Sequence, residues 1–439
     1  MISIHKREMR GLARVVSLTL LAAATTVACT DASRILNQEA PSRVDAATLD
    51  NPVYAQLLVN GAIGDFECSF VQYIIAGGLV GDELIDSQLA QAGWDYDRRT
   101  IFSGSIPYST GSCNSTQTPG LYTPLSVARF QGDHALKLLQ GWTDAQVANR
   151  QSLIATAATY AGYSLVLLGE GMCSAAIDQG PELSRAQVDS EALKRFATAI
   201  TAATGANNTT MLNAAHIGRA RALLDLGQVA AAGAEAATVP DSFALTASYS
   251  SAVTRRENLV WTQMYRGFYS SVDPSFRNLT WQGVPDPRVK VVDAGIKGQD
   301  QATEVFQQTK YGNIGAPISI ARSAEAQLIK AEADNATGTP AGNASAVAAI
   351  NLLHTKANIP PYAGGTQAEV QAQIIEERRR ELFLESQRLG DLIRYNLQAT
   401  PVKGTPFSKG GAYGLDTGIQ LCFPLPDVER NNNPSISHP

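Results

Sequence analysis

The chain has 439 residues and a formal net charge of −5, and 44% of its residues are hydrophobic. This length allows two or three domains and a large buried core. Residues 1–28 carry a net charge of +3, so the remainder carries −8. An acidic chain argues against nucleic acid or an anionic membrane surface as a partner. Abundant alanine and few aromatic residues favour closely packed helices.

Residues 1–28 are predicted to be a lipoprotein signal peptide. A basic stretch, HKREMRGLAR, precedes an uncharged run of 14 residues, VVSLTLLAAATTVA, which is too short to span a bilayer comfortably. The run ends in TVAC at Cys29 and resembles a bacterial lipobox, which implies cleavage before Cys29 and acylation of that cysteine. Residues 29–50 are then the acylated cysteine and a polar, flexible tether. A secreted protein with a coincidental cysteine is the alternative.

Four further cysteines, Cys68, Cys113, Cys173 and Cys422, predict two disulfides in an exported protein, with three possible connectivities. Their spacing fits no zinc motif, and the chain has only five scattered histidines. We therefore expect neither a metal site nor a cofactor.

From residue 51 onward the patterns are mainly helical. Residues 51–87 predict two helices with a break near Gly61–Gly64. Residues 93–124, rich in Gly, Ser, Thr and Pro, predict a long loop, and loops of this length are usually functional or mobile. Further helices are expected at 125–142, 148–172, 190–203, 212–239, 321–338, 344–359 and 374–395.

The stretch 212–240 resembles a tetratricopeptide (TPR) unit of two antiparallel helices. Four small residues at helical spacing allow a partner helix to approach closely: Ala214, Ala215, Gly218 and Ala222. A turn at 226–228 and a stop at Pro240 bound the second helix. The segments 321–338 and 344–359 have the same form. Residues 241–318, with two of the four tryptophans, predict an irregular insertion with short strands.

The segment IIEERRRELFLESQRLGDLIRY is predicted to be one long helix with charges on its apolar face. Arg378 and Glu385 fall in the middle of that face, and Glu381 and Arg388 at its edge. Buried charges must be paired. We expect the pairs Glu376–Arg380, Arg388–Asp391 and Asp391–Arg394 within the helix. We expect Arg378 and Glu385 to pair with neighbouring helices, so that these residues have a structural role.

Three ordered stretches resemble the SusD/RagB family of outer-membrane nutrient-binding lipoproteins: 318–333 with 346–358, then 374–395, then 421–437. The family motif E-R-x-x-E-L-x-x-E-x-x-R-x-x-D-L-x-R is matched by Glu377, Arg378, Glu381, Leu382, Glu385, Arg388, Asp391, Leu392 and Arg394. The terminal P-x-P-x-x-E-x-x-x-N-P is matched by Pro424, Pro426, Glu429, Asn433 and Pro434. Asp286-Pro287-Arg288 resembles the family's D-P-R. One departure is Ser386, where the family usually has glycine.

The resemblance implies a mostly α, SusD-like scaffold of about four TPR-like helix pairs over residues 51–439, with irregular loops and minor β structure in the insertion. It also implies a lipid-anchored protein on the bacterial outer membrane. Such a protein would capture an oligosaccharide and pass it to a SusC-like, TonB-dependent transporter, without chemistry on the ligand. Two alternatives are a scaffold that binds peptides or another nutrient, and a TPR-type adaptor with protein partners only.

Sugar recognition needs flat aromatic surfaces flanked by polar groups. Two segments offer both: GWDYDRR and the insertion. The candidate ligand-binding residues are Trp94, Tyr96, Asp97, Arg98, Trp261, Tyr265, Trp281 and Arg288. We expect Trp94 and Tyr96 to be exposed, whereas Trp261 and Tyr265, four residues apart, are equally compatible with a core position. Hydrolase, phosphate-loop and C-x-x-C motifs are lacking in the sequence, so we do not expect an enzyme.

Overall fold

The computed structural model describes residues 46–90, 93–407, 409 and 416–436. The chain separates into two units, Met1–Asn51 and Pro52–Pro439. In the first unit the structure describes only residues 46–51, which contain the short helix α2 (Ala46–Leu49). The predicted signal peptide, Cys29 and most of the tether therefore lie outside the described residues. The rest of this description concerns the second unit.

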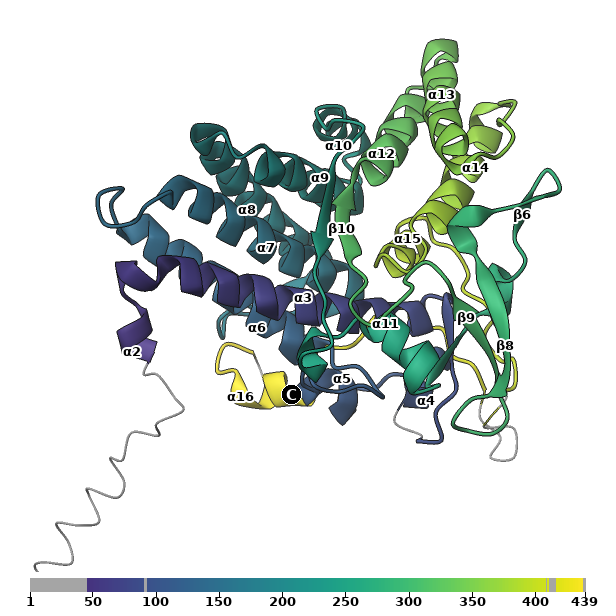
Figure 1. Cartoon of the computed structure of the whole chain (residues 1–439), viewed down its shortest axis with the longest axis horizontal. Helices are drawn as coiled ribbons and strands as arrows, with labels where there is room; N and C mark the ends of the chain where they lie inside the picture. The colour runs from purple at the N-terminus through teal and green to yellow at the C-terminus, as the bar shows by residue number, and fades with distance from the viewer. Residues whose placement is uncertain (1–45, 91–92, 408, 410–415, 437–439) are drawn as a thin grey trace, which may run out of the picture. The chain divides into compact units, whose positions relative to one another are not determined.

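The first half of this unit is a stack of helices (Figure 1). Helix α3 packs against α6 and α7, α7 against α8, α8 against α9, and α9 against α10. The bounds are α3 Ala55–Val80, α6 Tyr122–Gly141, α7 Arg150–Gly171, α8 Arg185–Ala206, α9 Thr209–Asp225 and α10 Val229–Ala236. Polar caps fix two of the starts, because Ser184 and Gln187 form a capping box on α8 and the Asn208 side chain caps α9.

Helices α3 and α7 are the core helices of this stack. Both are long and apolar enough to cross a membrane by composition alone, but 83% and 89% of their apolar windows are buried inside the protein. The predicted break near Gly61–Gly64 is wrong, since α3 runs unbroken through both glycines. An interior glycine costs a helix only about 1 kcal/mol, and the burial of α3 along most of its length outweighs that cost.

Helices α9 and α10 form the antiparallel pair expected at 212–240. Gly227, with a φ of +72°, makes the turn between them, and α10 ends before Pro240. Gly218 lies against the rings of Phe196 in α8 and Tyr163 in α7. The small residues of α9 thus allow the close approach that the pattern predicted.

A second helical group follows in the chain (Figure 1). It contains α12 (Ser323–Ala336), α13 (Pro340–Ala357), α14 (Gln367–Glu381) and α15 (Arg388–Arg394). Helix α12 packs against α10, α13 and α14, so it joins this group to the first.

The prediction of one helix over 374–395 is wrong. Residues 382–387 leave the helical path between α14 and α15. Leu384 and Ser386 adopt left-handed φ angles of 55° and 70°. The Leu384 N–H is donated to Glu83 Oε1, at 2.8 Å, instead of to the preceding turn. Helical periodicity alone did not reveal this break because its hydrogen-bond partner comes from the far end of the chain.

The strands among the described residues pair into five two-stranded antiparallel sheets. The pairs are β1 Leu84–Asp86 with β5 Ser270–Val272, β2 Ser174–Ala175 with β3 Leu183–Ser184, β4 Ala244–Ala247 with β10 Ile318–Arg322, β6 Thr280–Trp281 with β7 Val284–Pro285, and β8 Val291–Lys297 with β9 Glu304–Gln308. Most of these strands lie in 241–318. The predicted mostly α fold with minor β structure in the insertion is confirmed.

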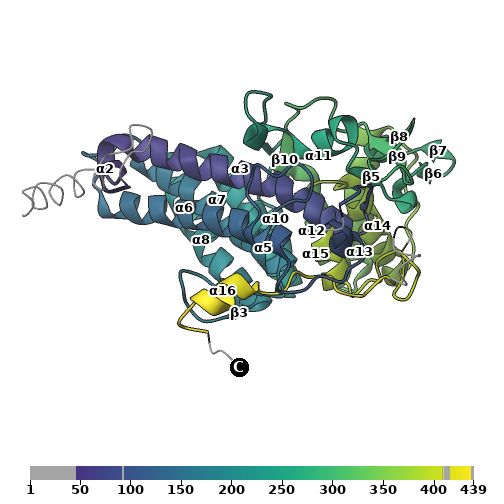
Figure 2. The ribbon, with the colours of Figure 1, turned by 90° about the horizontal axis from the view of Figure 1, so that it is seen from below.

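Two disulfides hold distant segments together. Cys68–Cys113 ties the segment 93–124 to α3, and Cys173–Cys422 ties the end of α7 to the C-terminal segment. The number of disulfides agrees with the prediction, and the connectivity that the sequence left open is now defined. Figure 2 shows α16 (Asp427–Asn432) beside β3, where Arg430 pairs with Glu182 at 2.7 Å.

Candidate ligand-binding site

The segment around Trp94 is packed, not exposed. Residues 94–97 form the short helix α4, and residues 106–110 form α5 (Ile106–Thr110), so 93–124 is not a featureless loop. Trp94 is 9% exposed and Tyr96 is fully buried, which makes the predicted exposure of both rings wrong. The Tyr96 hydroxyl donates to the Pro119 carbonyl at 2.9 Å, and its ring meets Phe423 edge-on. The polar composition of this segment had predicted exposed rings, but contacts with the C-terminal segment, such as that of Tyr96 with Phe423, bury them.

The polar residues beside Trp94 also serve the fold. Asp97 Oδ2 accepts the backbone N–H of Asp86 at 2.8 Å, and burial raises the pKa of Asp97 to about 7. Arg98 pairs with Asp95 at 2.8 Å. The Asp86 carboxylate is paired in turn with Lys409. These contacts leave the α4 segment without an open aromatic surface.

The insertion presents a different aromatic group. Asn258 caps the short helix α11 (Leu259–Trp261), and a wide turn, η4 (Thr262–Arg266), continues it. This geometry stacks the rings of Trp261 and Tyr265, with centroids 5.5 Å apart and planes inclined by 5°. Both residues are half-buried. They are therefore neither core residues nor fully exposed, an outcome between the two predicted possibilities.

Polar groups flank this Trp261–Tyr265 pair. The Tyr265 hydroxyl donates to the Gln308 carbonyl at 2.7 Å, which fixes its ring. Arg266 is 48% exposed at its side chain and is held by two hydrogen bonds to Glu257. A fixed aromatic pair beside an oriented guanidinium is the combination that sugar rings and their hydroxyls require.

Trp281 and Arg288 lie elsewhere in the insertion. Trp281, in the β6–β7 hairpin, packs edge-on against His354 and Tyr362, and its Nε1–H donates to the Pro360 carbonyl at 2.8 Å. Arg288 is almost buried and pairs with Asp286 at 2.7 Å and Glu377 at 2.5 Å. Burial opposes the charge of Arg288, but the hydrogen bonds to these carboxylates outweigh it and raise its pKa. Both residues anchor the insertion to α13 and α14.

The charged residues of 376–394 form ion pairs with many elements. Arg378 Nε donates to both oxygens of Asp391, each at 2.9 Å, and both side chains are buried. Glu376 pairs with Arg380 at 2.6 Å, inside α14. Arg394 lies between Asp391, at 3.1 Å, and Glu332 of α12, at 2.5 Å.

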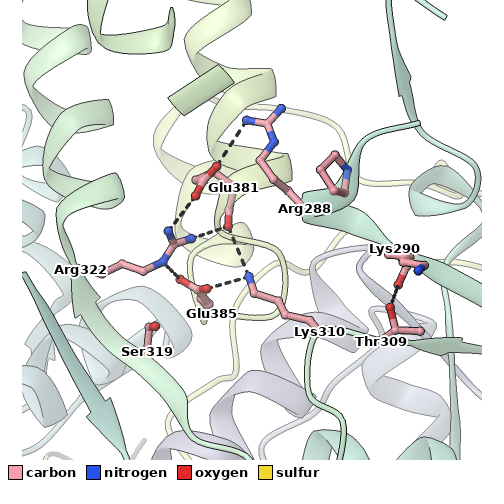
Figure 3. A pocket seen from close by; sticks show the side chains of 9 residues that line it. Arg288, Lys290, Thr309, Lys310, Ser319, Arg322, Glu381 and Glu385 are labelled. Carbon is pink, nitrogen blue, oxygen red and sulfur yellow. Dashed lines mark hydrogen bonds and ion pairs between the residues drawn. The ribbon is translucent and has the colours of Figure 1, made fainter. Parts of the chain in front are cut away.

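Three further pairs reach more distant elements. Arg388 pairs with Asp82, after α3, at 2.8 Å, and not with Asp391 as expected, because the Asp391 carboxylate is bound by Arg378 and Arg394. Glu381 and Glu385 both bind Arg322 of β10, at 2.7 and 2.8 Å (Figure 3).

Beside this network lies a cavity of about 700 Å³, seen in Figure 3. Its walls are formed by residues 287–290 before β8, residues 309–310 after β9, strand β10, and the region of Glu381 and Glu385 at the α14–α15 break. The sequence analysis did not identify Lys290, Lys310, Ser319 and Arg322 as neighbours. They are scattered over more than 30 residues with no shared motif, so no pattern could have grouped them.

Comparison with known proteins identifies the fold and supports a family for the C-terminal third of the chain. Residues 290–437 match the SusD family model. Starch-binding protein SusD from Bacteroides thetaiotaomicron is 28% identical over 172 residues, which cover 37% of this chain and 30% of that protein. A laminarin-binding SusD-like protein superposes with a TM-score of 0.61 at 16% identity, over 88% of this chain and 98% of the other. Surface glycan-binding protein A from Bacteroides uniformis gives 0.63 at 14%, with the same coverage.

These matches support a relationship to the SusD/RagB family, carried in sequence by residues 290–437. The matched segment spans less than a third of the curated relative, and the family model begins at residue 290. Trp261 and Tyr265 lie before that residue, in a part of the chain that the SusD family model does not match. Their candidacy therefore rests on geometry alone.

The structure explains how a serine is accommodated at position 386, where the SusD/RagB motif usually has glycine. Ser386 has a φ of 70°, in the left-handed region that favours glycine. Here the serine is held by Arg221, whose Nη2 donates to the Ser386 carbonyl at 2.9 Å and whose Nη1 reaches Oγ at 3.3 Å. These bonds offset the backbone preference for glycine.

Proposed function

We propose that this protein captures a carbohydrate on the surface formed by Trp261 and Tyr265. The single observation that carries this proposal is the half-buried, parallel ring pair on the insertion, fixed by Asn258 and Gln308 and flanked by Arg266. Similar proteins include a starch-binding, a laminarin-binding and a surface glycan-binding protein, which supports the same ligand class. Laminarin and starch are therefore the first ligands to test.

We also propose that the mature protein is lipid-anchored through Cys29 on the bacterial outer membrane and delivers its ligand to a SusC-like, TonB-dependent transporter. The lipobox-like TVAC sequence and the match to the SusD family model support this location. Binding is reversible in this proposal, and the protein performs no chemistry on the ligand. Radiolabelled palmitate incorporated into the wild-type chain and lost in Cys29→Ala would test the anchor directly.

The ring pair is tested by Trp261→Ala, with binding of laminarin and starch measured by calorimetry and affinity electrophoresis. Loss of one aromatic contact should weaken binding roughly tenfold, which corresponds to about 1.4 kcal/mol. A matched control is Phe130→Ala, because Phe130 of α6 is also exposed and also stacks on a neighbouring ring, that of His134. This control should leave the affinity unchanged.

The outcomes separate the alternatives. Equal affinities of Trp261→Ala and the wild-type protein would move the binding surface away from the ring pair. Binding of a peptide panel without binding of any glycan would favour a peptide nutrient. Binding of neither class, together with co-purification of protein partners only, would favour a TPR-type adaptor.

A further inference from the structure

The cavity beside α14 differs in character from the Trp261–Tyr265 surface. Four cationic side chains line it, from Arg288, Lys290, Lys310 and Arg322, together with the two carboxylates of Glu381 and Glu385 (Figure 3). Thr309 and Ser319 add hydroxyls, and no aromatic ring lines it among the described residues. A ligand in this cavity would therefore be selected by charge and hydrogen bonding, because the walls provide no ring on which a sugar face could stack.

The carboxylates of the cavity are already neutralised. Glu385 accepts from Lys310 at 2.7 Å through one oxygen and from Arg322 at 2.8 Å through the other. Burial disfavours the charge of Glu385, but these two cations outweigh burial and hold its pKa below its usual value. Glu381 is bound by the same arginine at 2.7 Å. Neither carboxylate is thus left as an unmatched negative charge toward the cavity.

The four cations of the cavity differ in whether a carboxylate is paired with them. Lys310 and Arg322 form ion pairs with Glu385 and Glu381. Arg288 forms ion pairs with Asp286 and Glu377. Lys290 is exposed and has no ion-pair partner among the residues that the structure describes. Figure 3 shows its side chain on the wall opposite the two glutamates. Among the described residues that line the cavity, Lys290 is therefore the cation that remains available to an anionic ligand.

Ser319 provides a second unused group. Its Oγ forms no hydrogen bond to any residue of the described ranges, although it faces the same cavity. The volume of about 700 Å³ is within the range of small-molecule sites and is large enough for a sugar residue. The Lys290 ammonium, with three donors, suits a carboxylate or a sulfate ester, and the Ser319 hydroxyl lies across the cavity from it (Figure 3).

We propose that this cavity binds the anionic group of an acidic sugar residue, a uronate carboxylate or a sulfate ester, held by Lys290. This inference deepens the proposed carbohydrate capture and rests on it, since it assigns part of the ligand to a second site. Neutral sugar rings are then held by the Trp261–Tyr265 pair, and acidic residues by the cavity.

The test uses the purified mature chain with three monosaccharide probes: D-glucuronate, D-glucose 6-sulfate and D-glucose, measured by calorimetry or ligand-observed NMR. At least one acid should bind roughly tenfold more tightly than glucose, because a hydrogen bond to an ionised group is about twice as strong as a neutral one. Raising the salt concentration from about 50 to about 500 mM should weaken the binding of the acid, since salt screens an exposed cation.

Lys290→Ala should lower the affinity for the acid roughly tenfold, whereas Ser319→Ala, across the cavity, should change it little. Lys297→Ala is the matched control, because Lys297 is also exposed on β8 but pairs with Glu304 at 3.5 Å, away from the cavity. The control should bind like the wild-type protein. Thermal melting of each variant identifies any that is misfolded.

Each outcome decides the proposal. Binding of both acids, weakened in Lys290→Ala, supports recognition of charge, and binding of one acid alone assigns a carboxylate or a sulfate. Acids that bind no more tightly than glucose, or equal losses in Lys290→Ala and Lys297→Ala, would overturn it. Laminarin binding measured in parallel separates the two sites, because its absence with glucuronate binding intact refutes the ring-pair proposal alone.

Discussion

Arg378 shows how a single buried charge connects sequence and structure in this protein. Its place on the apolar face of a helix required a buried partner, and that partner is Asp391, 13 residues later, beyond a break in the helix. Asp391 also accepts from Arg394, and burial is outweighed by these two cations, so the pKa of Asp391 is lowered. Each of the three charges thus depends on the others.

Arg378→Ala should lower the free energy of unfolding by about 3 kcal/mol, measured by urea denaturation. Breaking a buried pair costs about 3–5 kcal/mol, and we expect the lower end because Asp391 keeps Arg394. The comparison is Lys194→Ala, which removes a surface pair with Glu191 and should change stability by less than about 1 kcal/mol. Losses of similar size in the two variants would mean that the Arg378 pair is not buried in solution.

Asp97 predicts a dependence of stability on pH. Burial raises its pKa from 3.8 to about 7 in the folded protein, whereas the unfolded chain keeps a value near 3.9. The folded state therefore binds a proton more tightly between these two values. The resulting stabilisation is fully present below about pH 4 and is lost as the pH rises through 7, by up to roughly 4 kcal/mol.

Asp97→Asn should remove this contribution, because an amide has no charge to bury. Unfolding free energies of the wild-type and variant proteins should be similar at pH 4, where Asp97 is protonated, and should diverge towards pH 8, where the variant should be the more stable. Asp144→Asn, at a side chain that is 73% exposed, should leave the wild-type profile unchanged. A constant difference between Asp97→Asn and the wild type across the range would show that Asp97 is ionised throughout.

At the scale of elements, the sequence located most helices but not their continuity. Helix α3 passes through Gly61 and Gly64, and the segment 374–395 breaks where no glycine or proline stands. Local propensity predicted the opposite in both cases. Burial of α3 against α6 and α7 outweighs its glycines, and contacts with Glu83 and Arg221 stabilise the left-handed turn at 384–386.

Two glycine substitutions test this account of the helices. Gly61→Ala should raise stability by about 0.5–1 kcal/mol, because a Cβ at Gly61 meets no atom within 4 Å and alanine has the higher helix propensity. Gly218→Ala should lower it by roughly 1–3 kcal/mol, since its Cβ would overlap the buried Phe196 ring and lie 3.0 Å from Tyr163 Cζ. Thermal or urea unfolding would detect both effects. A destabilised Gly61→Ala would contradict an unbroken α3.

At the scale of the whole molecule, the two disulfides connect parts that are distant in sequence. Cys173–Cys422 spans 249 residues and joins the end of α7 to the C-terminal segment, whereas Cys68–Cys113 spans 45. A longer loop removes more entropy from the unfolded chain. The Cys173–Cys422 bond should therefore contribute more stability than Cys68–Cys113.

Replacing both Cys173 and Cys422 with alanine should cost about 5 kcal/mol, and replacing Cys68 and Cys113 about 4 kcal/mol, by the loop-entropy relation. Urea unfolding of the two double variants under oxidising conditions would give this order. Reduction of the wild-type protein should lower its stability below that of either variant. A larger loss of stability on removing Cys68–Cys113 would contradict this order, and would mean that loop length does not decide which disulfide stabilises the protein more.

The sequence by itself determined the helical class, the TPR-like pair at 212–240, the strands of the insertion, the number of disulfides and the charged segment that must find buried partners. These features depend on residues close together in the chain, through periodicity, turns and the cost of an unpaired charge. The motif order also indicated the family.

Only the tertiary structure decided which aromatic rings are accessible and which charges meet. Trp94 is covered because Phe407 packs against its ring and its Nε1–H donates to the Gln88 carbonyl, whereas Trp261 stays half-buried because a wide turn stacks it on Tyr265. Lys290, Ser319 and Glu385 share a cavity although they are far apart in sequence. Exposure and long-range pairing depend on which segments pack together, and residue type and local spacing do not contain that information.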